Sequence, residues 1–288
     1  MRFLAGVLCA LILATLMIDR PLQAAASCEG LASLALPNAT ITVARPVEAG
    51  AFAPPDAAGG GSPAFRALPA FCRVAATLKP SSDSDIKIEV WMPAANWNGK
   101  FQAVGNGAFN GNVAYAAMST ALGRGYAAAS TDTGHTGGSA SFGLGHPEKV
   151  IDFGWRAVHE MTVASKKIIA AYYESGPRLS YWNGCSAGGR QGLKEAQRFP
   201  ADFDGIVAGA PGIDWTGRAA QALHVAQALQ KKPRRPYGVD RQIIRPLETA
   251  SIGRTARYRS SGTRAASSIT NRSRPVNAIR AAAFTTSR

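Results

Sequence analysis

The segment GCSAG at residues 184–188 constrains the fold more than any other feature of the sequence. It fits the pattern G-x-S-x-G. A strand-like stretch over residues 179–183 precedes it, and a helical pattern over residues 191–199 follows it. In that context the pattern predicts a sharp turn from a strand into a helix, with the hydroxyl of Ser186 held clear of the sheet. Glycine is required at 184 and 188 because side chains there would collide with neighbouring elements.

This turn suggests a nucleophilic serine. Ser186 would attack an ester carbonyl, and the N–H of Ala187 at the start of the helix would stabilise the oxyanion. Gly105 and Gly107 follow another short strand, so either N–H is a candidate for the second oxyanion donor. The alternatives are an N-cap serine in a glycine-rich turn for Ser186 and a plain tight turn for the two glycines.

Strand and helix patterns alternate along the chain, which predicts an α/β protein with a parallel sheet. The clearest strand is Ile86–Val90, where apolar residues alternate with Lys87 and Glu89. Further strands are expected over residues 101–104, 125–130, 179–183 and 204–211, and helices over 155–174, 191–199 and 219–230. Residues 46–70 are rich in Pro, Ala and Gly, which predicts a surface loop or linker.

The N-terminus predicts export from the cytoplasm. A basic start, an apolar run over residues 4–18 and three alanines at 24–26 are typical of a signal peptide covering residues 1–26. An uncleaved membrane anchor and a lipoprotein attached through Cys28 are weaker alternatives. A secreted or periplasmic protein meets an oxidising environment, so we expect a disulfide between Cys28 and Cys72.

The formal net charge of +14 is concentrated in the C-terminal segment. Residues 231–288 contain 14 Lys and Arg against 2 acidic residues, whereas residues 1–230 contain 18 against 16. Because the body of the chain is nearly balanced, we expect no nucleic-acid partner. We also expect no membrane contact after signal cleavage, and no phosphate-binding Gly-Lys motif is present.

Several longer motifs resemble the tannase and feruloyl esterase family. The resemblance runs from about residue 28 to about residue 230. It rests on YWNGCSAGGRQGL at 181–193, EAQRFP at 195–200, DFDGIVAGAP at 202–211, STDTGHT at 130–136, LGHPEKVIDF at 144–153 and RAVHEM at 156–161. It implies an α/β-hydrolase fold and a secreted serine esterase that cleaves aromatic esters, such as gallate, hydroxycinnamate or terephthalate esters, without a cofactor.

The same resemblance implies parts that this sequence does not show. Family members place a lid domain with a structural calcium site, and then a catalytic Asp and His, after the nucleophile. No histidine follows His224 here. We therefore expect a partial α/β-hydrolase sheet, no metal ligands, and a fragment with little or no activity. Cys185, whose family counterpart bonds a cysteine beside the catalytic histidine, is expected to be a free thiol.

Residues 231–288 form a basic segment that we expect to be disordered. Its arginine-rich, acid-poor composition is typical of a GC-rich gene translated in the wrong frame, so a frameshift near residue 230 is one hypothesis. A genuine cationic tail is the other, and it would suit an alternative function, a secreted non-catalytic binding module. Hydrolysis of a hydroxycinnamate ester separates the two functions.

None of the four histidines, His135, His146, His159 and His224, is expected to serve as the base for Ser186. Asp132 and His135 lie in one loop after an expected strand. They would either shape the substrate pocket or make structural hydrogen bonds.

Overall fold

The computed structural model describes residues 26–55 and 63–231. The expected signal peptide, apart from Ala26, and the expected basic tail, apart from Lys231, lie outside the described residues. Within those residues, no helix is both long enough and apolar enough to span a bilayer.

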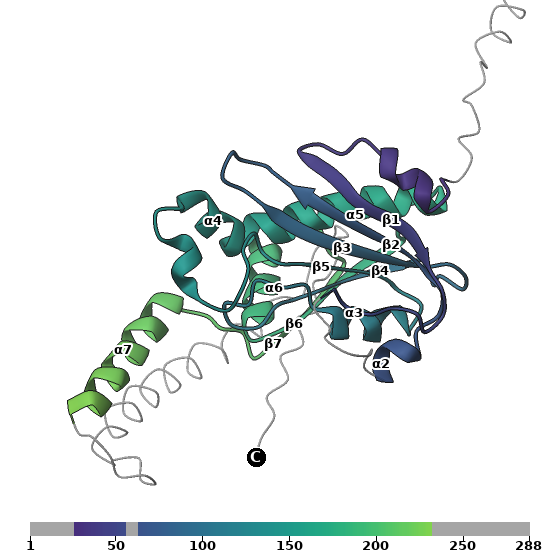
Figure 1. The fold of residues 1–288 in the computed structure, drawn as a ribbon. Coiled ribbons are helices and arrows are strands. Elements are labelled where there is room, and N and C mark those ends of the chain that lie inside the picture. The colour runs from purple at the N-terminus through teal and green to yellow at the C-terminus, as the bar shows by residue number, and fades with distance from the viewer. Residues whose placement is uncertain (1–25, 56–62, 232–288) are drawn as a thin grey trace, which may run out of the picture. The chain divides into compact units, whose positions relative to one another are not determined.

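The described chain contains seven strands with helices between them (Figure 1). The elements are η1 (Glu29–Ser33), β1 (Ala39–Val47), α2 (Pro63–Arg66), β2 (Phe71–Leu78), β3 (Ile86–Pro93), β4 (Lys100–Val104), α3 (Tyr115–Leu122), β5 (Ala127–Thr131), η2 (Ala140–Gly143), α4 (Pro147–Ile151), the π-helical turn η3 (Asp152–Arg156), α5 (Ala157–Tyr173), β6 (Leu179–Cys185), α6 (Ala187–Arg198), β7 (Gly205–Gly209) and α7 (Trp215–Lys231).

The strands form one sheet in the order β1-β2-β3-β5-β4-β6-β7. The expectation of an α/β fold is confirmed, but the sheet is mixed rather than parallel. Strands β5, β4, β6 and β7 pair in parallel, whereas β1, β2, β3 and β5 pair antiparallel. The difference arises because β1, β2 and β3 follow one another without a crossover helix long enough to return the chain to the same end of the sheet.

Alternation along the strands divides the core into two clusters, one on each face of the sheet. In β5, Ala127 and Ala129 face the cluster that includes α5, while Ala128 faces the cluster that includes α3. Helix α5 contributes Val158, Met161 and Ile168 to the first cluster. Figure 1 shows α5 on one side of the sheet and α3 with α2 on the other. Strand β5 is therefore buried on both faces, whereas β6 and β7 bury one face and leave Leu179 and Val207 exposed on the other.

The segment over residues 46–70 is not merely a surface loop or linker. Phe52, Phe65 and Leu68 are buried against Trp91 and α3 in the second cluster. The ring centroids of Phe52 and Trp91 lie 4.4 Å apart. The few apolar side chains of a Pro- and Gly-rich segment thus anchor it to the sheet, which composition alone does not reveal.

The disulfide expected between Cys28 and Cys72 is confirmed. Its Cα atoms are 5.6 Å apart, and it joins the residue before η1 to β2 across 44 residues of sequence. Cys185, the remaining cysteine among the described residues, is an exposed free thiol, as expected.

The chain divides into two compact units with a boundary after Pro211. Of the second unit, the structure describes residues 212–231, which contain α7. This helix confirms the one expected over 219–230, and both Leu223 and His224 are exposed on it.

Candidate active site

Ser186 lies at a strand–helix turn between the end of β6 and the first residue of α6. Its backbone has φ 58° and ψ −114°, a strained conformation for a residue with a side chain. The Ser186 N–H donates to the Gly209 carbonyl at the end of β7 (3.0 Å), and the Ser186 carbonyl accepts the N–H of Arg190 (3.0 Å). Hydrogen bonds to both its N–H and its carbonyl therefore stabilise Ser186 in this strained conformation. The residue is exposed to solvent.

The glycines of the turn allow backbone to pack directly on backbone. A Cβ at Gly184 would lie 2.5 Å from the carbonyl atoms of Gly188, and a Cβ at Gly105 would lie 2.5 Å from the Gly188 Cα. The Gly188 N–H also donates to the Asn106 carbonyl (2.8 Å). The loop after β4 thus packs against the first turn of α6, beside Ser186.

Helix α6 begins at Ala187, four residues earlier than the sequence pattern suggested. Gly188 and Gly189 have low helix propensity, so the sequence pattern does not predict a helix over this first turn. An N–H in the first turn of a helix has no acceptor within the helix. The Ala187 N–H, the predicted oxyanion donor, therefore lies at the start of the helix beside Ser186.

Gly105 is not available as an oxyanion donor. Its N–H donates to the Asn183 carbonyl (3.0 Å), which extends the pairing of β4 with β6. The next N–H, that of Asn106, donates to Gln191 Oε1 (3.1 Å). The Gly107 N–H has no acceptor among the described residues, so it is the candidate that remains.

Asn106 and Gln191 hold the loop, and sequence reasoning missed both. Besides the bond to the Asn106 N–H, Gln191 Nε2 donates to Asn106 Oδ1 (3.1 Å). Asn106 Nδ2 donates to the carbonyls of Thr131 (2.8 Å) and Asn112 (3.0 Å). The only hint in the sequence is a polar residue between two glycines at the end of a strand.

Ser186 Oγ makes no hydrogen bond to a histidine within residues 26–55 and 63–231. His135 Nε2 lies 2.7 Å from the Phe109 carbonyl, His146 contacts Asp83, and His159 contacts Asp202. These three side chains have partners away from Ser186, and the expectation that none is its base stays a prediction.

Asp132 and His135 take part in local hydrogen bonding. Asp132 Oδ1 accepts the N–H groups of Lys87 (2.9 Å) and Gly134 (2.8 Å). Burial disfavours the charged form and raises the pKa of Asp132 to about 7. Both residues line a cavity of about 440 Å³ whose lining does not include Ser186.

A sheet whose parallel part carries a strand–serine–helix turn defines an α/β-hydrolase fold. Residues 72–252 match the family model described as tannase and feruloyl esterase. The chain belongs to this family, and the similar proteins described below are carboxylic ester hydrolases.

Similar proteins carry esterase names. An uncharacterized esterase of Xanthomonas campestris pv. campestris is 46% identical over 199 residues, which cover 68% of this chain and 34% of that protein. A probable feruloyl esterase B-1 of Aspergillus fumigatus is 43% identical over 162 residues, covering 56% of this chain and 30% of that protein. The chain therefore spans about a third of the length of these relatives.

Solved structures agree with the fold. The crystal structure of feruloyl esterase B from Aspergillus oryzae superposes with a TM-score of 0.63 at 38% identity, over 68% of this chain and 39% of that chain. Tannin acyl hydrolase from Aspergillus niger superposes with a TM-score of 0.54 at 22% identity, over 73% and 39% of the two chains. The second comparison supports the fold alone.

Proposed function

We propose that this chain carries the nucleophile of a secreted serine esterase acting on aromatic carboxylic esters of the hydroxycinnamate or gallate type. The observation that carries the proposal is the strained, exposed Ser186 between β6 and the start of α6. The names of the relatives supply the substrate class. The disulfide between Cys28 and Cys72 supports an oxidising compartment and hence secretion.

The proposed chemistry is acyl transfer. Ser186 Oγ attacks the ester carbonyl and loses its proton to a solvent water, which later returns a proton to the departing alkoxide. The carbonyl oxygen becomes an oxyanion that accepts hydrogen bonds from the N–H groups of Ala187 and Gly107. Collapse expels the alcohol and leaves an acyl group on Ser186, which water then removes. Asn106 and Gln191 act as positioning residues, because their hydrogen bonds fix the loop that carries Gly107. These steps require no cofactor.

The test is covalent labelling by a fluorophosphonate, read by intact-mass and peptide mass spectrometry. Ser186 Oγ should bond to phosphorus with loss of fluoride, giving one label per chain. Labelling should be slow, because serine is a weak nucleophile without an adjacent base, and Ser186 Oγ has no hydrogen-bonded histidine among the described residues.

Two variants control the labelling experiment. Ser186→Ala should lose the label, while Cys185→Ser should retain it and so exclude the neighbouring thiol. A label on another residue in folded protein would contradict the assignment, as would hydrolysis of methyl ferulate that persists in Ser186→Ala.

A further inference from the structure

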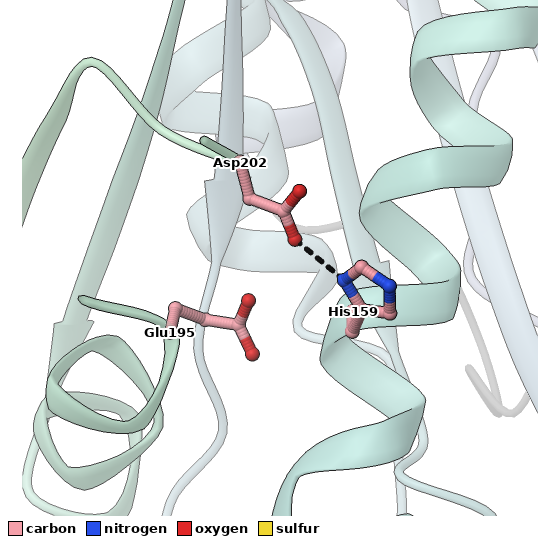
Figure 2. Close-up of side chains that lie close together, drawn as sticks. All are labelled: His159, Glu195 and Asp202. Atoms are coloured by element: carbon pink, nitrogen blue, oxygen red, sulfur yellow. Dashed lines mark hydrogen bonds and ion pairs between the residues drawn. The ribbon is translucent and has the colours of Figure 1, made fainter. Parts of the chain in front are cut away.

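Three side chains far from the turn at Ser186 converge between α5, α6 and β7. Figure 2 shows His159 from the first turn of α5, Glu195 from α6 and Asp202 from the connection between α6 and β7, with their polar atoms facing one another. One ligand atom from each lies within 4.8 Å of the others. His159 Nδ1 is 2.7 Å from Asp202 Oδ2.

Glu195 makes this cluster unusual. Glu195 is 0% exposed, yet among the described residues neither of its carboxylate oxygens accepts a hydrogen bond from an N–H group, a hydroxyl group or a cationic side chain. Buried polar atoms are almost always paired, so an unpaired carboxyl group requires an explanation. In Figure 2 the carboxylate points into the space in front of the His159 ring and Asp202.

The protein's own cations do not fill this space. Lys166 Nζ donates to the backbone carbonyl of Asp202, and the guanidinium of Arg198 lies 4.1 Å from the centroid of the Trp155 ring. Neither forms an ion pair with Glu195 within the described residues. The buried carboxyl group of Glu195 therefore faces the partly buried carboxylate of Asp202 without a cation of the described chain beside it, an arrangement that disfavours ionisation of Glu195.

We propose that His159, Glu195 and Asp202 bind a divalent transition-metal ion of the Zn²⁺ type. One imidazole nitrogen and two carboxylate oxygens are ligands that Zn²⁺ accepts, whereas Ca²⁺ and Mg²⁺ bind through oxygen alone. Two carboxylates match the charge of a divalent ion. Tetrahedral Zn²⁺ ligands lie about 3.4 Å apart, so small side-chain adjustments bring these three into place and leave one position for water.

The ring of His159 is already oriented for this role. It stacks on Phe199, with ring centroids 3.7 Å apart and an interplanar angle of 12°. Packing of this kind fixes the direction of a ligand before the metal arrives, which reduces the entropy lost on binding.

The proposed site is structural rather than catalytic. Glu195 follows Ser186 by nine residues along α6, which corresponds to about 13 Å along the helix axis. A bound ion would connect α5, α6 and the chain entering β7. It would thereby brace the helix whose first turn packs beside the nucleophile.

The experiment uses the untagged 288-residue chain, stripped of metal by a chelator and titrated with Zn²⁺ by calorimetry and thermal unfolding. We expect one ion per chain and a rise in Tm of about 5–10 °C at a hundredfold excess over Kd. Equal concentrations of Mg²⁺ or Ca²⁺ should give no comparable rise. Absence of any Zn²⁺-dependent rise would overturn the proposal and would indicate that a protonated Glu195 alone occupies the site.

Variants locate the binding. Glu195→Gln and Asp202→Asn should each weaken Zn²⁺ binding at least tenfold, while His146→Ala, at an exposed histidine paired with Asp83, should bind as the wild type does. Equal binding by Glu195→Gln, or loss of binding in His146→Ala, would mean an adventitious ion only. If the first two variants do not fold, the wild-type protein loaded with Co²⁺ decides: intense tetrahedral absorption supports the site, and weak octahedral absorption overturns it.

Discussion

A buried glutamate lies in the antiparallel half of the sheet and another lies beside the parallel half, and their hydrogen bonding differs. In the antiparallel half, Glu89 on β3 accepts hydrogen bonds from Arg73, Trp91 and Tyr115, and Arg73 neutralises its charge. Beside the parallel half, Glu195 on α6 is equally buried, yet no cation and no N–H group of the described residues contacts its carboxylate oxygens. The contrast indicates that side chains of the antiparallel half satisfy its buried glutamate. Beside the parallel half, the buried glutamate can still bind a group from outside the described chain, such as a metal ion.

The most direct way to break the comparison is to neutralise each glutamate in metal-free protein. Glu89→Gln should lower the free energy of unfolding by about 3–5 kcal/mol, because it leaves the buried Arg73 cation uncompensated. Glu195→Gln should change it by about 1 kcal/mol or less. Burial and the nearby Asp202 raise the pKa of Glu195 to about 8, so the wild-type group is already mostly neutral at pH 7. Urea unfolding at pH 7 measures the free energy of unfolding of both variants. Equal losses would contradict the difference between the two glutamates.

The disulfide is the second element of the antiparallel half to test. The double variant Cys28→Ser with Cys72→Ser should lower the free energy of unfolding by about 2–4 kcal/mol, because the loop closed by the bond spans 44 residues. Cys185→Ser is the control and should leave stability unchanged, since that thiol is exposed and unpaired. Chemical denaturation measures the difference, and a comparable loss in Cys185→Ser would contradict the assignment.

The parallel half should be sensitive to backbone crowding instead. Gly105→Ala places a Cβ 2.5 Å from the Gly188 Cα, and relief of this clash should cost about 1–3 kcal/mol of stability. The same variant should slow fluorophosphonate labelling of Ser186, because it displaces the first turn of α6. Gly107→Ala is a matched control two residues away, where the nearest atom to the new Cβ is Asn110 Nδ2 at 3.7 Å. Equal effects at the two positions would contradict the close approach.

The pH dependence of stability concerns Asp132, which follows β5, the strand shared by the two halves. Burial raises its pKa from 3.8 to about 7. The folded state thus holds this proton more tightly than the unfolded chain does, and the resulting stabilisation is full below pH 3.8 and lost as pH rises through about 7. Asp132→Asn should remove most of this fall in stability, which for a shift of this size amounts to about 4 kcal/mol across the window. Urea midpoints from pH 4 to 8 measure the change, with the exposed Glu48→Gln as a control that should retain the wild-type slope.

Local signals predicted much of this structure. Alternation over residues 86–90 located β3, the G-x-S-x-G pattern located the turn at Ser186, and the export signal led to the disulfide between Cys28 and Cys72. Each of these depends on a short stretch of chain or on the chemistry of a compartment. Such signals can be interpreted without knowing which elements become neighbours in the fold.

What sequence reasoning missed depends on distant contacts. Gln191 and Asn106 are 85 residues apart and meet only because α6 packs on the loop after β4. The sequence makes Gly105 a candidate oxyanion donor, but the structure shows that its N–H donates to the Asn183 carbonyl beside the pairing of β4 with β6. His159, Glu195 and Asp202 form no motif, since they come from three separate elements.

The strand order has a consequence for how the chain reaches its native state. Strand β5 lies between β3 and β4, although β4 precedes it in sequence. During synthesis, β4 emerges before the strand that joins it to β3, so the sheet cannot grow by adding each strand to the last. A chain that emerges from its N-terminus must hold β4 without β5 until residue 131 has followed, after which β5 can bridge the two parts. The other edge of β4 stays open until β6 has followed, so the aggregation-prone interval of folding is expected to last until the strand that carries Ser186 at its end has paired.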